Sequence, residues 1–352
     1  MDIVQDVFGT FKERTIHRYT MTNEVGVTVT VTNFGAIITS LKVPDRQGQE
    51  TDVVLGYDTL EGYIKDSIYI GSLVGRYANR IKGGVLKIAE SIYQLSCNRP
   101  GIHLHGGDEG FNKKIWEADI IEDRRGHGLQ LSLTSPDGDE GYPGTLQVRV
   151  SYILTENSEL IIDYTAETDK PTVVNLTQHS YFNLAGKGDI TDHVMQINAS
   201  EYTPVGPDLI PSGELAAVED SPFDFRSPRR IDQAMSEEGT RKNAGEGFDH
   251  NYVLDTRGDV KKVAASVYHE ESGRIMDVYT TKPGMQLYTG NYLDGRWKGR
   301  GGVGFFKHAA LCLETQYYPD SPNQRLFPSP LLVPGDLYHH TTIYRFGLQG
   351  GA

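Results

Sequence analysis

An alternation of apolar and polar residues with a period of two constrains the fold of this chain more than any other feature. Four valines alternate with small or polar residues over 25–31, and the same pattern recurs at 129–133 and 146–154. Successive side chains of a strand point to opposite faces, so this period predicts strands with one buried face. Shorter segments with a similar pattern are 160–166, 263–268, 275–280, 285–289 and 341–346.

Turn signals separate these segments, and helical signals are few. The turn signals are Pro44-Asp45, Asp137-Gly138, Pro143-Gly144, Arg257-Gly258, Pro283-Gly284 and Pro334-Gly335. Short helices are expected at 58–66 and 228–237, and the charged segment 236–247 is expected to be a flexible loop. The chain contains 39 Gly and 16 Pro, which suits many turns and argues against a helix bundle.

Strands that follow one another without intervening helices favour antiparallel pairing. The length of 352 residues is compatible with two domains of typical size or with one large β domain. Neither a repeat nor a linker-like stretch divides the sequence. We therefore expect an all-β fold, a large antiparallel sandwich or barrel that spans 1–352 as a single domain.

The charge balance and the cysteine content limit the partners and the location. The chain has 47 acidic and 34 basic residues, a net charge of −13, so it repels nucleic acid and anionic membrane surfaces, and neither is expected as a partner. No apolar stretch approaches the ~18 residues of a spanning helix, and the N-terminal segment does not resemble a secretion signal. The two cysteines, Cys97 and Cys312, cannot form a disulfide framework, so a cytoplasmic location is expected.

The first candidate site is NLTQHSYFNL, residues 175–184. As a strand, it would carry on one face Asn175, Thr177, His179, Tyr181 and Asn183. Amides and hydroxyls both donate and accept hydrogen bonds, so this face suits a polyhydroxylated ligand. An exposed face with an incidental histidine fits the spacing equally well.

The second candidate site is Glu314 in AALCLETQ, residues 309–316. A carboxylate at the end of an apolar run is partly desolvated, which raises its pKa toward the range of a base that works near neutral pH. The alternative is that the strand ends here and Glu314 points to water, which is the more common outcome for a lone glutamate.

The third candidate site combines GRYANRI at 75–81 with GIHLHGG at 101–107. Arginine, asparagine and histidine side chains lie here beside glycines, which allow a ligand to approach the backbone closely. Arg76 and Arg80 fit surface charges equally well.

A metal site is the other interpretation of these histidines. His103 and His105 are two residues apart, which on a strand makes them face the same way, and His179 or Glu314 would add further ligands. No CxxC or HExxH motif accompanies them, so no metal is expected.

The order of the motifs along nearly the whole chain resembles that of aldose 1-epimerases, the galactose mutarotase family. The similar segments are FGAIITSLKVPDRQG, GRYANRI, LHGG, SPDGDEGYPG, NLTQHSYFNL, FDFR, GFDHNYVL, YTTKPGMQLYTGN, LETQYYPDSPN and HTTIYRFG. The resemblance implies a large single-domain β-sandwich of the galactose mutarotase type. It also implies a cofactor-free reaction that interconverts the α and β anomers of free aldoses such as glucose and galactose.

The resemblance also implies roles for individual residues. His179 matches the general acid of the family and Glu314 its general base. Sugar-contacting positions are matched by Asn79, Arg80, His105, Asp249 and Gln286. Tyr181 or Trp297 is expected to cover an apolar face of the sugar, whereas the resemblance assigns no role to His103.

Three other functions stay open at this point. A sugar-phosphate epimerase of the same fold needs a basic cluster, and the net acidity and the few arginines near the motifs count against it. A non-catalytic sugar-binding protein has no need for both His179 and Glu314. A glycoside hydrolase needs two carboxylates, which Glu314 and Asp249 could supply. The sequence leaves undecided which aldose is preferred and whether the protein is a monomer or a homodimer.

Overall fold

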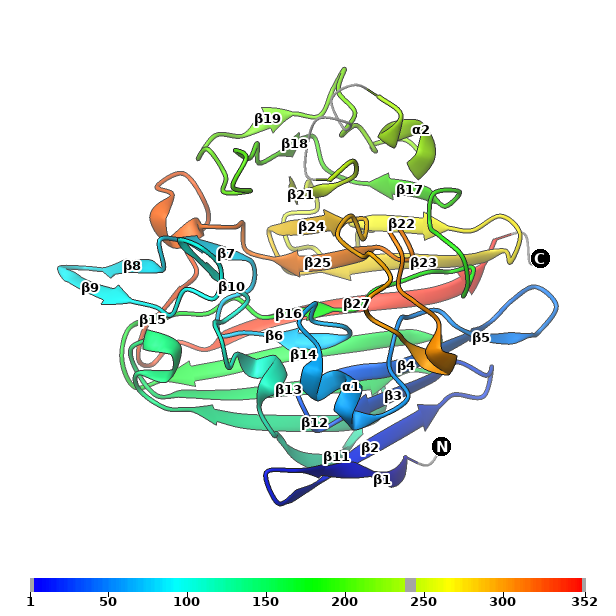
Figure 1. Cartoon of the computed structure of the whole chain (residues 1–352), viewed down its shortest axis with the longest axis horizontal. Coiled ribbons are helices and arrows are strands. Elements are labelled where there is room, and N and C mark those ends of the chain that lie inside the picture. The colour runs from blue at the N-terminus through cyan, green and yellow to red at the C-terminus, as the bar shows by residue number, and fades with distance from the viewer. Residues whose placement is uncertain (1–2, 238–244, 350–352) are drawn as a thin grey trace.

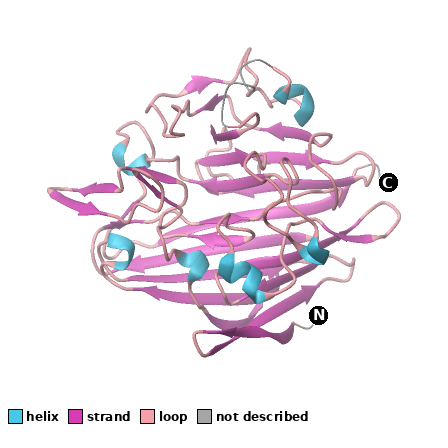
Figure 2. Ribbon diagram, in the orientation of Figure 1, coloured by secondary structure: helices cyan, strands magenta, loops and turns pink. Residues whose placement is uncertain are grey.

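A computed structural model describes residues 3–237 and 245–349, and strands form most of its regular structure (Figures 1 and 2). All pairs of neighbouring named strands are antiparallel, as predicted. The α-helices of the described residues are α1 (Leu60–Lys65) and α2 (Ile231–Met235), which lie inside the two predicted helical segments. Most of the predicted flexible loop, residues 238–244, lies outside the described residues.

A nine-stranded sheet forms one layer of the molecule. In spatial order its strands are β11 (Glu117–Asp123), β12 (Gly126–Ser135), β13 (Leu146–Leu154), β14 (Glu159–Thr168), β27 (Tyr338–Leu348), β23 (Arg274–Thr280), β22 (Ala265–Tyr268), β17 (Val194–Ile197) and β20 (Arg229–Arg230). The alternation at 146–154 is confirmed, because Val148, Val150 and Tyr152 are at most 1% exposed. The C-terminal strand β27 lies in the middle of the sheet, between β14 and β23.

Two five-stranded sheets and a short two-stranded sheet form the facing layer (Figure 1). The N-terminal sheet has β1 (Val4–Phe11), β2 (Arg14–Thr22), β3 (Thr28–Thr32), β4 (Ile37–Pro44) and β5 (Glu50–Asp52). The second sheet has β19 (Ala216–Ala217), β18 (Glu201–Tyr202), β21 (Asp249–Val253), β24 (Gly284–Tyr288) and β25 (Cys312–Gln316). The short sheet pairs β6 (Ser72–Val74) with β16 (Thr177–His179), and β16 also contacts β25.

Three more strand pairs lie outside these layers. They are β7 (Arg80–Lys82) with β10 (Ile102–Leu104), β8 (Val85–Ile88) with β9 (Ser91–Gln94), and β15 (Thr172–Val173) with β26 (Leu331–Leu332). No helix of the described residues is long and apolar enough to cross a membrane.

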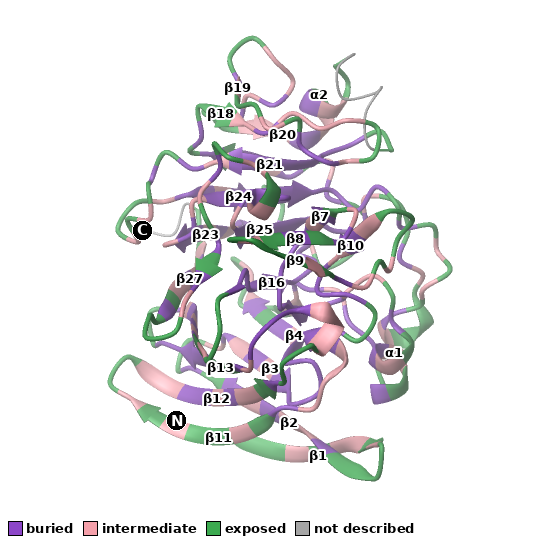
Figure 3. Ribbon diagram, turned by 90° about the vertical axis from the view of Figure 1, so that its left-hand side faces the viewer, coloured by how far each residue is buried: buried purple, intermediate pink, exposed green. Residues whose placement is uncertain are grey.

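One hydrophobic core lies between the two layers. It joins Val29 of β3, Val150 of β13, Val278 of β23 and Leu287 of β24 in a single cluster. Strands β21, β24 and β25 are largely buried, whereas the edge strands β1 and β11 are mostly exposed or half-buried (Figure 3). The molecule is therefore a large antiparallel β-sandwich, which confirms the predicted fold class.

The site lies on the face of β25 that points away from the core between the two layers. Leu313 packs into the core, so its neighbour Glu314 points to the opposite face of the same strand. Loops cover that face, and Glu314 is only 2% exposed. The sandwich thus presents polar side chains to a covered cavity on its outer surface.

Candidate active site

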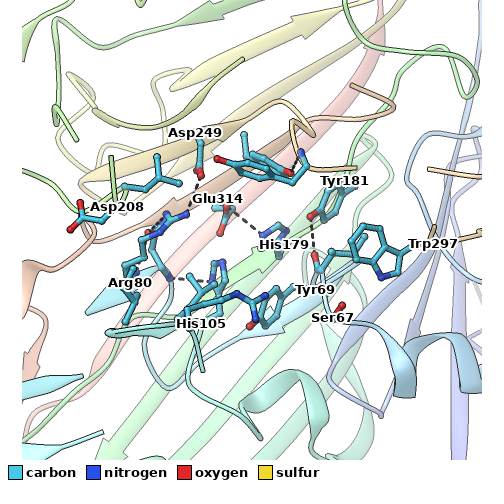
Figure 4. Close-up of a pocket in the computed structure, with 18 of the residues that line it drawn as sticks. Ser67, Tyr69, Arg80, His105, His179, Tyr181, Asp208, Asp249, Trp297 and Glu314 are labelled. Atoms are coloured by element: carbon cyan, nitrogen blue, oxygen red, sulfur yellow. Dashed lines mark hydrogen bonds and ion pairs between the residues drawn. The ribbon is translucent and has the colours of Figure 1, made fainter. Parts of the chain in front are cut away.

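A cavity of about 500 Å³ lies on this outer face of β25 (Figure 4). It is lined by all the predicted site residues except Gln286, namely Asn79, Arg80, His105, His179, Tyr181, Asp249 and Glu314. These residues come from widely separated parts of the sequence. The structure therefore brings together the three candidate segments that the sequence analysis treated separately.

His179 and Glu314 face each other across adjacent strands. His179 ends β16 and Glu314 lies in the middle of β25, and the two strands are in contact. Nε2 of His179 lies 3.6 Å from Oε1 of Glu314, and both side chains are nearly inaccessible to solvent. The prediction that Glu314 is desolvated is confirmed, and the alternative that it points to water is wrong.

Burial shifts the pKa values of Glu314 and His179 in opposite directions. Burial raises the pKa of Glu314 to about 8; the charge of Asp249 adds to this rise and that of Arg80 opposes it. Burial lowers the pKa of His179 to about 4. Around neutral pH the pair therefore holds one proton, which the two groups share as a coupled unit.

Two tyrosine rings hold the imidazole of His179. The ring of Tyr181 stacks on it with centroids 5.1 Å apart, and Tyr69 stacks at 6.0 Å. The hydroxyl of Tyr181 donates to the carbonyl oxygen of Ile68, which fixes this ring in place. Tyr181 borders the cavity but is only 3% exposed, so it fixes His179 and offers little surface to a sugar.

His105 is a neutral hydrogen-bond donor. Its Nδ1 accepts from the backbone N–H of Asn79 at 3.2 Å, so the proton of the neutral ring lies on Nε2. Burial lowers the pKa of His105 well below its usual range, and the charges of His179 and Arg80 lower it further. His105 follows β10 with a φ of 51°, and a Cβ on the next residue, Gly106, would lie 1.8 Å from the carbonyl oxygen of Gly75.

This protonation argues against a metal in the cavity. Potential ligand atoms of His105, His179 and Glu314 lie within 4.8 Å of one another. The lone pair of His105, however, is already used by the N–H of Asn79, and its other nitrogen carries a proton. This donor set suits a sugar hydroxyl or a ring oxygen better than a cation.

The prediction that His103 and His105 face the same way is wrong. His103 is fully buried, with Nδ1 2.6 Å from the carbonyl oxygen of Ser96 and Nε2 2.6 Å from the hydroxyl of Tyr142. Strand β10 ends at Leu104, and the left-handed backbone at His105 breaks the alternation of a strand. His103 is thus a structural residue outside the cavity.

The two arginines of 75–81 differ in role. Arg76 is 2% exposed and donates to the carbonyl oxygens of Pro143 and Gly144, so the surface-charge interpretation is wrong for it. Arg80 lines the cavity, where its Nη1 donates to Oδ1 of Asn79 and its Nη2 lies 3.1 Å from Oδ2 of Asp249.

Gln286 lies behind the cavity and acts on Asp249. Its Nε2 donates to Oδ1 of Asp249 at 2.6 Å, while Arg80 holds the other carboxylate oxygen. The register of the sheet explains this contact, because Gln286 is paired with Glu314 on one side and lies two residues from Tyr288, the partner of Asp249, on the same face of β24. The carboxylate of Asp249 therefore has a fixed orientation.

The segment 175–184 is not the single open strand that its pattern predicts. Only 177–179 form a strand, and all ten residues are buried. Nδ2 of Asn175 donates to the carbonyl oxygen of Ala78, and that of Asn183 donates to the carbonyl oxygen of Ala309. Both asparagines are structural, and the alternative of a solvated face is also wrong.

The sequence analysis missed several residues that line the cavity. They include Tyr69, Arg99, Asp208, Tyr292 and Arg296, whereas Trp297 was considered as an aromatic cover. Most of them lie in loops without a periodic pattern, and in Tyr69 a φ of 62° turns the chain sharply. In the sequence, only the aromatic side chains of Tyr181 and Trp297 indicated a contact with the sugar outside the charged and amide residues.

Comparisons with known proteins show the family of the chain. The family model of aldose 1-epimerase matches residues 17–345. Galactose mutarotase of Homo sapiens is 43% identical over 98% of this chain and 99% of its own length. Aldose 1-epimerase of Escherichia coli (strain K12) is 38% identical over 93% of this chain and 94% of its own length.

A solved structure shares the fold as well. The GalM/aldose epimerase homologue from C. elegans superimposes with a TM-score of 0.86 at 31% identity, covering 94% of this chain and 98% of its own. The chain belongs to the aldose 1-epimerase family of isomerases.

Proposed function

We propose that this cavity interconverts the α and β anomers of free aldoses, such as galactose and glucose, by opening and closing the sugar ring. The observation that carries the proposal is the buried pair of His179 and Glu314, 3.6 Å apart at the cavity wall. Ring opening requires a base at the C1 hydroxyl and an acid at the ring oxygen, and this pair supplies one of each.

The reaction needs no net proton from solvent. Glu314 accepts the proton of the C1 hydroxyl while His179 donates a proton to the ring oxygen, and the bond from C1 to that oxygen breaks to give the open aldehyde. Rotation about the bond from C1 to C2 then presents the other face of the aldehyde. On closure the two groups exchange roles, and each returns to its starting state.

The active form places the single proton of the pair on His179. A bound sugar favours this form, because its C1 hydroxyl donates to the Glu314 carboxylate and its ring oxygen accepts from the His179 imidazolium. Both side chains are nearly inaccessible to solvent, which strengthens these interactions relative to water.

Three neighbours orient the sugar and stabilise charge. The Nε2–H of His105 and the guanidinium of Arg80 are available to negative charge that develops on the ring oxygen. The fixed carboxylate of Asp249 accepts from sugar hydroxyls, which sets the position of C1 against the pair.

The test is the rate of anomer exchange of galactose and of glucose, measured by polarimetry. Glu314→Gln and His179→Asn are each expected to lose most of the acceleration, since either one removes half of the acid–base pair. Glu122→Gln and His127→Asn, on the surface strands β11 and β12, are matched controls that should keep it. Full activity in either active-site variant contradicts the assignment.

Activity should also be unchanged in EDTA, and its loss there would support a metal instead.

Further properties of the chain are part of this proposal. The core that joins both halves of the sandwich supports a single domain over 1–352. Both cysteines, Cys97 and Cys312, are free, which is consistent with a cytoplasmic location. The enzyme is proposed to act without a cofactor, as a monomer or a homodimer.

A further inference from the structure

The rim of the catalytic cavity carries a guanidinium group that pairs with no acid among the described residues. This group belongs to Arg99, which is exposed and donates from Nη1 to the carbonyl oxygen of Asn98 at 3.2 Å. The other two arginines of the cavity are paired, Arg80 with Asp249 and Arg296 with Asp294. Arg99 therefore retains a positive charge that is free to meet a ligand.

The arginines of the cavity differ in how far their charge is neutralised. Arg80 pairs with Asp249 and Arg296 pairs with Asp294, whereas Arg99 has no ion-pair partner among the described residues. The unpaired guanidinium of Arg99 therefore favours a ligand that brings a negative charge to this part of the rim.

The proposed reaction geometry indicates which part of a sugar lies toward Arg99. With Glu314 at the C1 hydroxyl and His179 at the ring oxygen, carbon C5 and its substituent C6 lie beyond His179, away from Glu314. Tyr69 lines the cavity beside His179: its ring stacks on the imidazole, and its hydroxyl accepts from Nδ2 of Asn98, the residue before Arg99, at 3.3 Å.

Arg99 lies on the side of the cavity that Tyr69 and His105 form. Its backbone forms a bridge with Ile102, the first residue of β10, and both residues line the cavity. Strand β10 leads directly to His105, whose ring centroid lies 4.6 Å from that of Tyr69. This is the side on which a substituent on C6 is expected.

We propose that the enzyme also interconverts the anomers of hexuronates, in which C6 is a carboxylate, and that Arg99 recognises this carboxylate. The inference rests on the proposed function and extends its substrate class from neutral to anionic aldoses. The chemistry at C1 is unchanged, since the carboxylate takes no part in ring opening. A guanidinium binds a carboxylate through two parallel hydrogen bonds, which a neutral hydroxymethyl group cannot replace.

The test compares galacturonate with galactose for the wild type, Arg99→Gln and Arg124→Gln, by exchange NMR of the two anomers. For Arg99→Gln, the ratio of kcat/KM on galacturonate to that on galactose is expected to fall roughly tenfold, as for loss of one charge-assisted contact. Arg124→Gln is the matched control, because Arg124 is an exposed arginine in the turn between β11 and β12, outside the cavity lining. Added salt should slow galacturonate exchange in the wild type and have less effect in Arg99→Gln.

Two outcomes overturn the proposal while the wild type still accelerates galactose exchange. One is a wild type that accelerates galactose but not galacturonate. The other is an Arg99→Gln variant that keeps its activity on galacturonate, or loses activity on both sugars to the same extent. A wild type that accelerates neither sugar contradicts the proposed function itself, so the two failures are distinguishable.

Discussion

At the scale of single residues, the site depends on polar groups whose orientation is fixed by hydrogen bonds to their neighbours. Gln286 and Arg80 each donate a hydrogen bond to one carboxylate oxygen of Asp249. The backbone N–H of Asn79 donates to Nδ1 of His105, which places the proton of that ring on Nε2. The sequence identified the residue types by resemblance, but not these contacts. They depend on strand register and on a left-handed backbone at His105, which no local pattern predicts.

Gln286→Leu is expected to raise KM for galactose several-fold with a smaller change in kcat. The substitution removes the 2.6 Å hydrogen bond to Oδ1 of Asp249, and the carboxylate that orients the sugar then loses one of its two anchors. The hydrophobic side chain stays out of the cavity, so the acid–base pair is not altered. Steady-state kinetics decide this prediction, and an unchanged KM in a variant with unchanged Tm contradicts it.

At the scale of elements, long strands were predictable and short covered ones were not. Strands β12 and β13 alternate clearly because one face meets the core and the other meets water. Strand β16 has only three residues, and its segment is buried on both faces, so the alternation at 175–184 did not show which side held the ligand. Because loops cover the outer face of this segment, its two faces do not differ in exposure, and the alternation could not predict which face meets the ligand.

Gly106→Ala is expected to destabilise the protein by about 2 kcal/mol or more and to reduce activity. At a φ of 88°, its Cβ would lie 1.8 Å from the carbonyl oxygen of Gly75, so the loop that carries His105 must move. Gly101→Ala is the matched control, because it also has a positive φ but has nothing within 4 Å of the added Cβ. Thermal unfolding and exchange rates test the pair, and equal effects of both substitutions contradict the steric explanation.

Lys282→Met is expected to stabilise the protein at neutral pH by about 2 kcal/mol. Lys282 is fully buried between Tyr317 and Tyr338 and hydrogen-bonds to the Tyr338 hydroxyl and to Asn175, so burial lowers its pKa well below 10.5. Folding must then remove a proton that the unfolded chain keeps below that value, which costs free energy.

The pH dependence of the stability gained by Lys282→Met gives a second measurement. The cost shrinks as the pH rises toward 10.5, where the unfolded chain also loses the proton, so the advantage of Lys282→Met should be smaller at pH 9.5 than at pH 7. Lys298→Met, at an exposed position, should show neither effect. Denaturant unfolding at both pH values measures it, and a variant less stable than the wild type at pH 7 contradicts the prediction.

At the scale of the whole molecule, the C-terminal strand ties together distant parts of the chain. β27 pairs with β14 on one side and with β23 on the other, and the continuous core includes both halves of the sandwich. The all-β class followed from alternation and turn signals alone, whereas the central position of β27 did not, because strand order is not encoded in local patterns.

The whole chain is expected to unfold in a single cooperative transition. Each half of the sandwich shares its core with the other, so neither half can unfold alone without exposing apolar surface. Differential scanning calorimetry tests this expectation through the ratio of calorimetric to van't Hoff enthalpy. A ratio near one is expected, and two resolved transitions contradict a single domain.

The most direct test of the acid–base pair is the pH dependence of kcat/KM for galactose. Below about 4 both His179 and Glu314 hold a proton and no base remains; above about 8 neither does and no acid remains. A bell-shaped profile with limbs near these two values is expected, and Glu314→Gln should lose the pair of limbs together with most of the activity. A rate that rises or falls in one direction across this range, or a bell that persists unchanged in Glu314→Gln, contradicts catalysis by this pair.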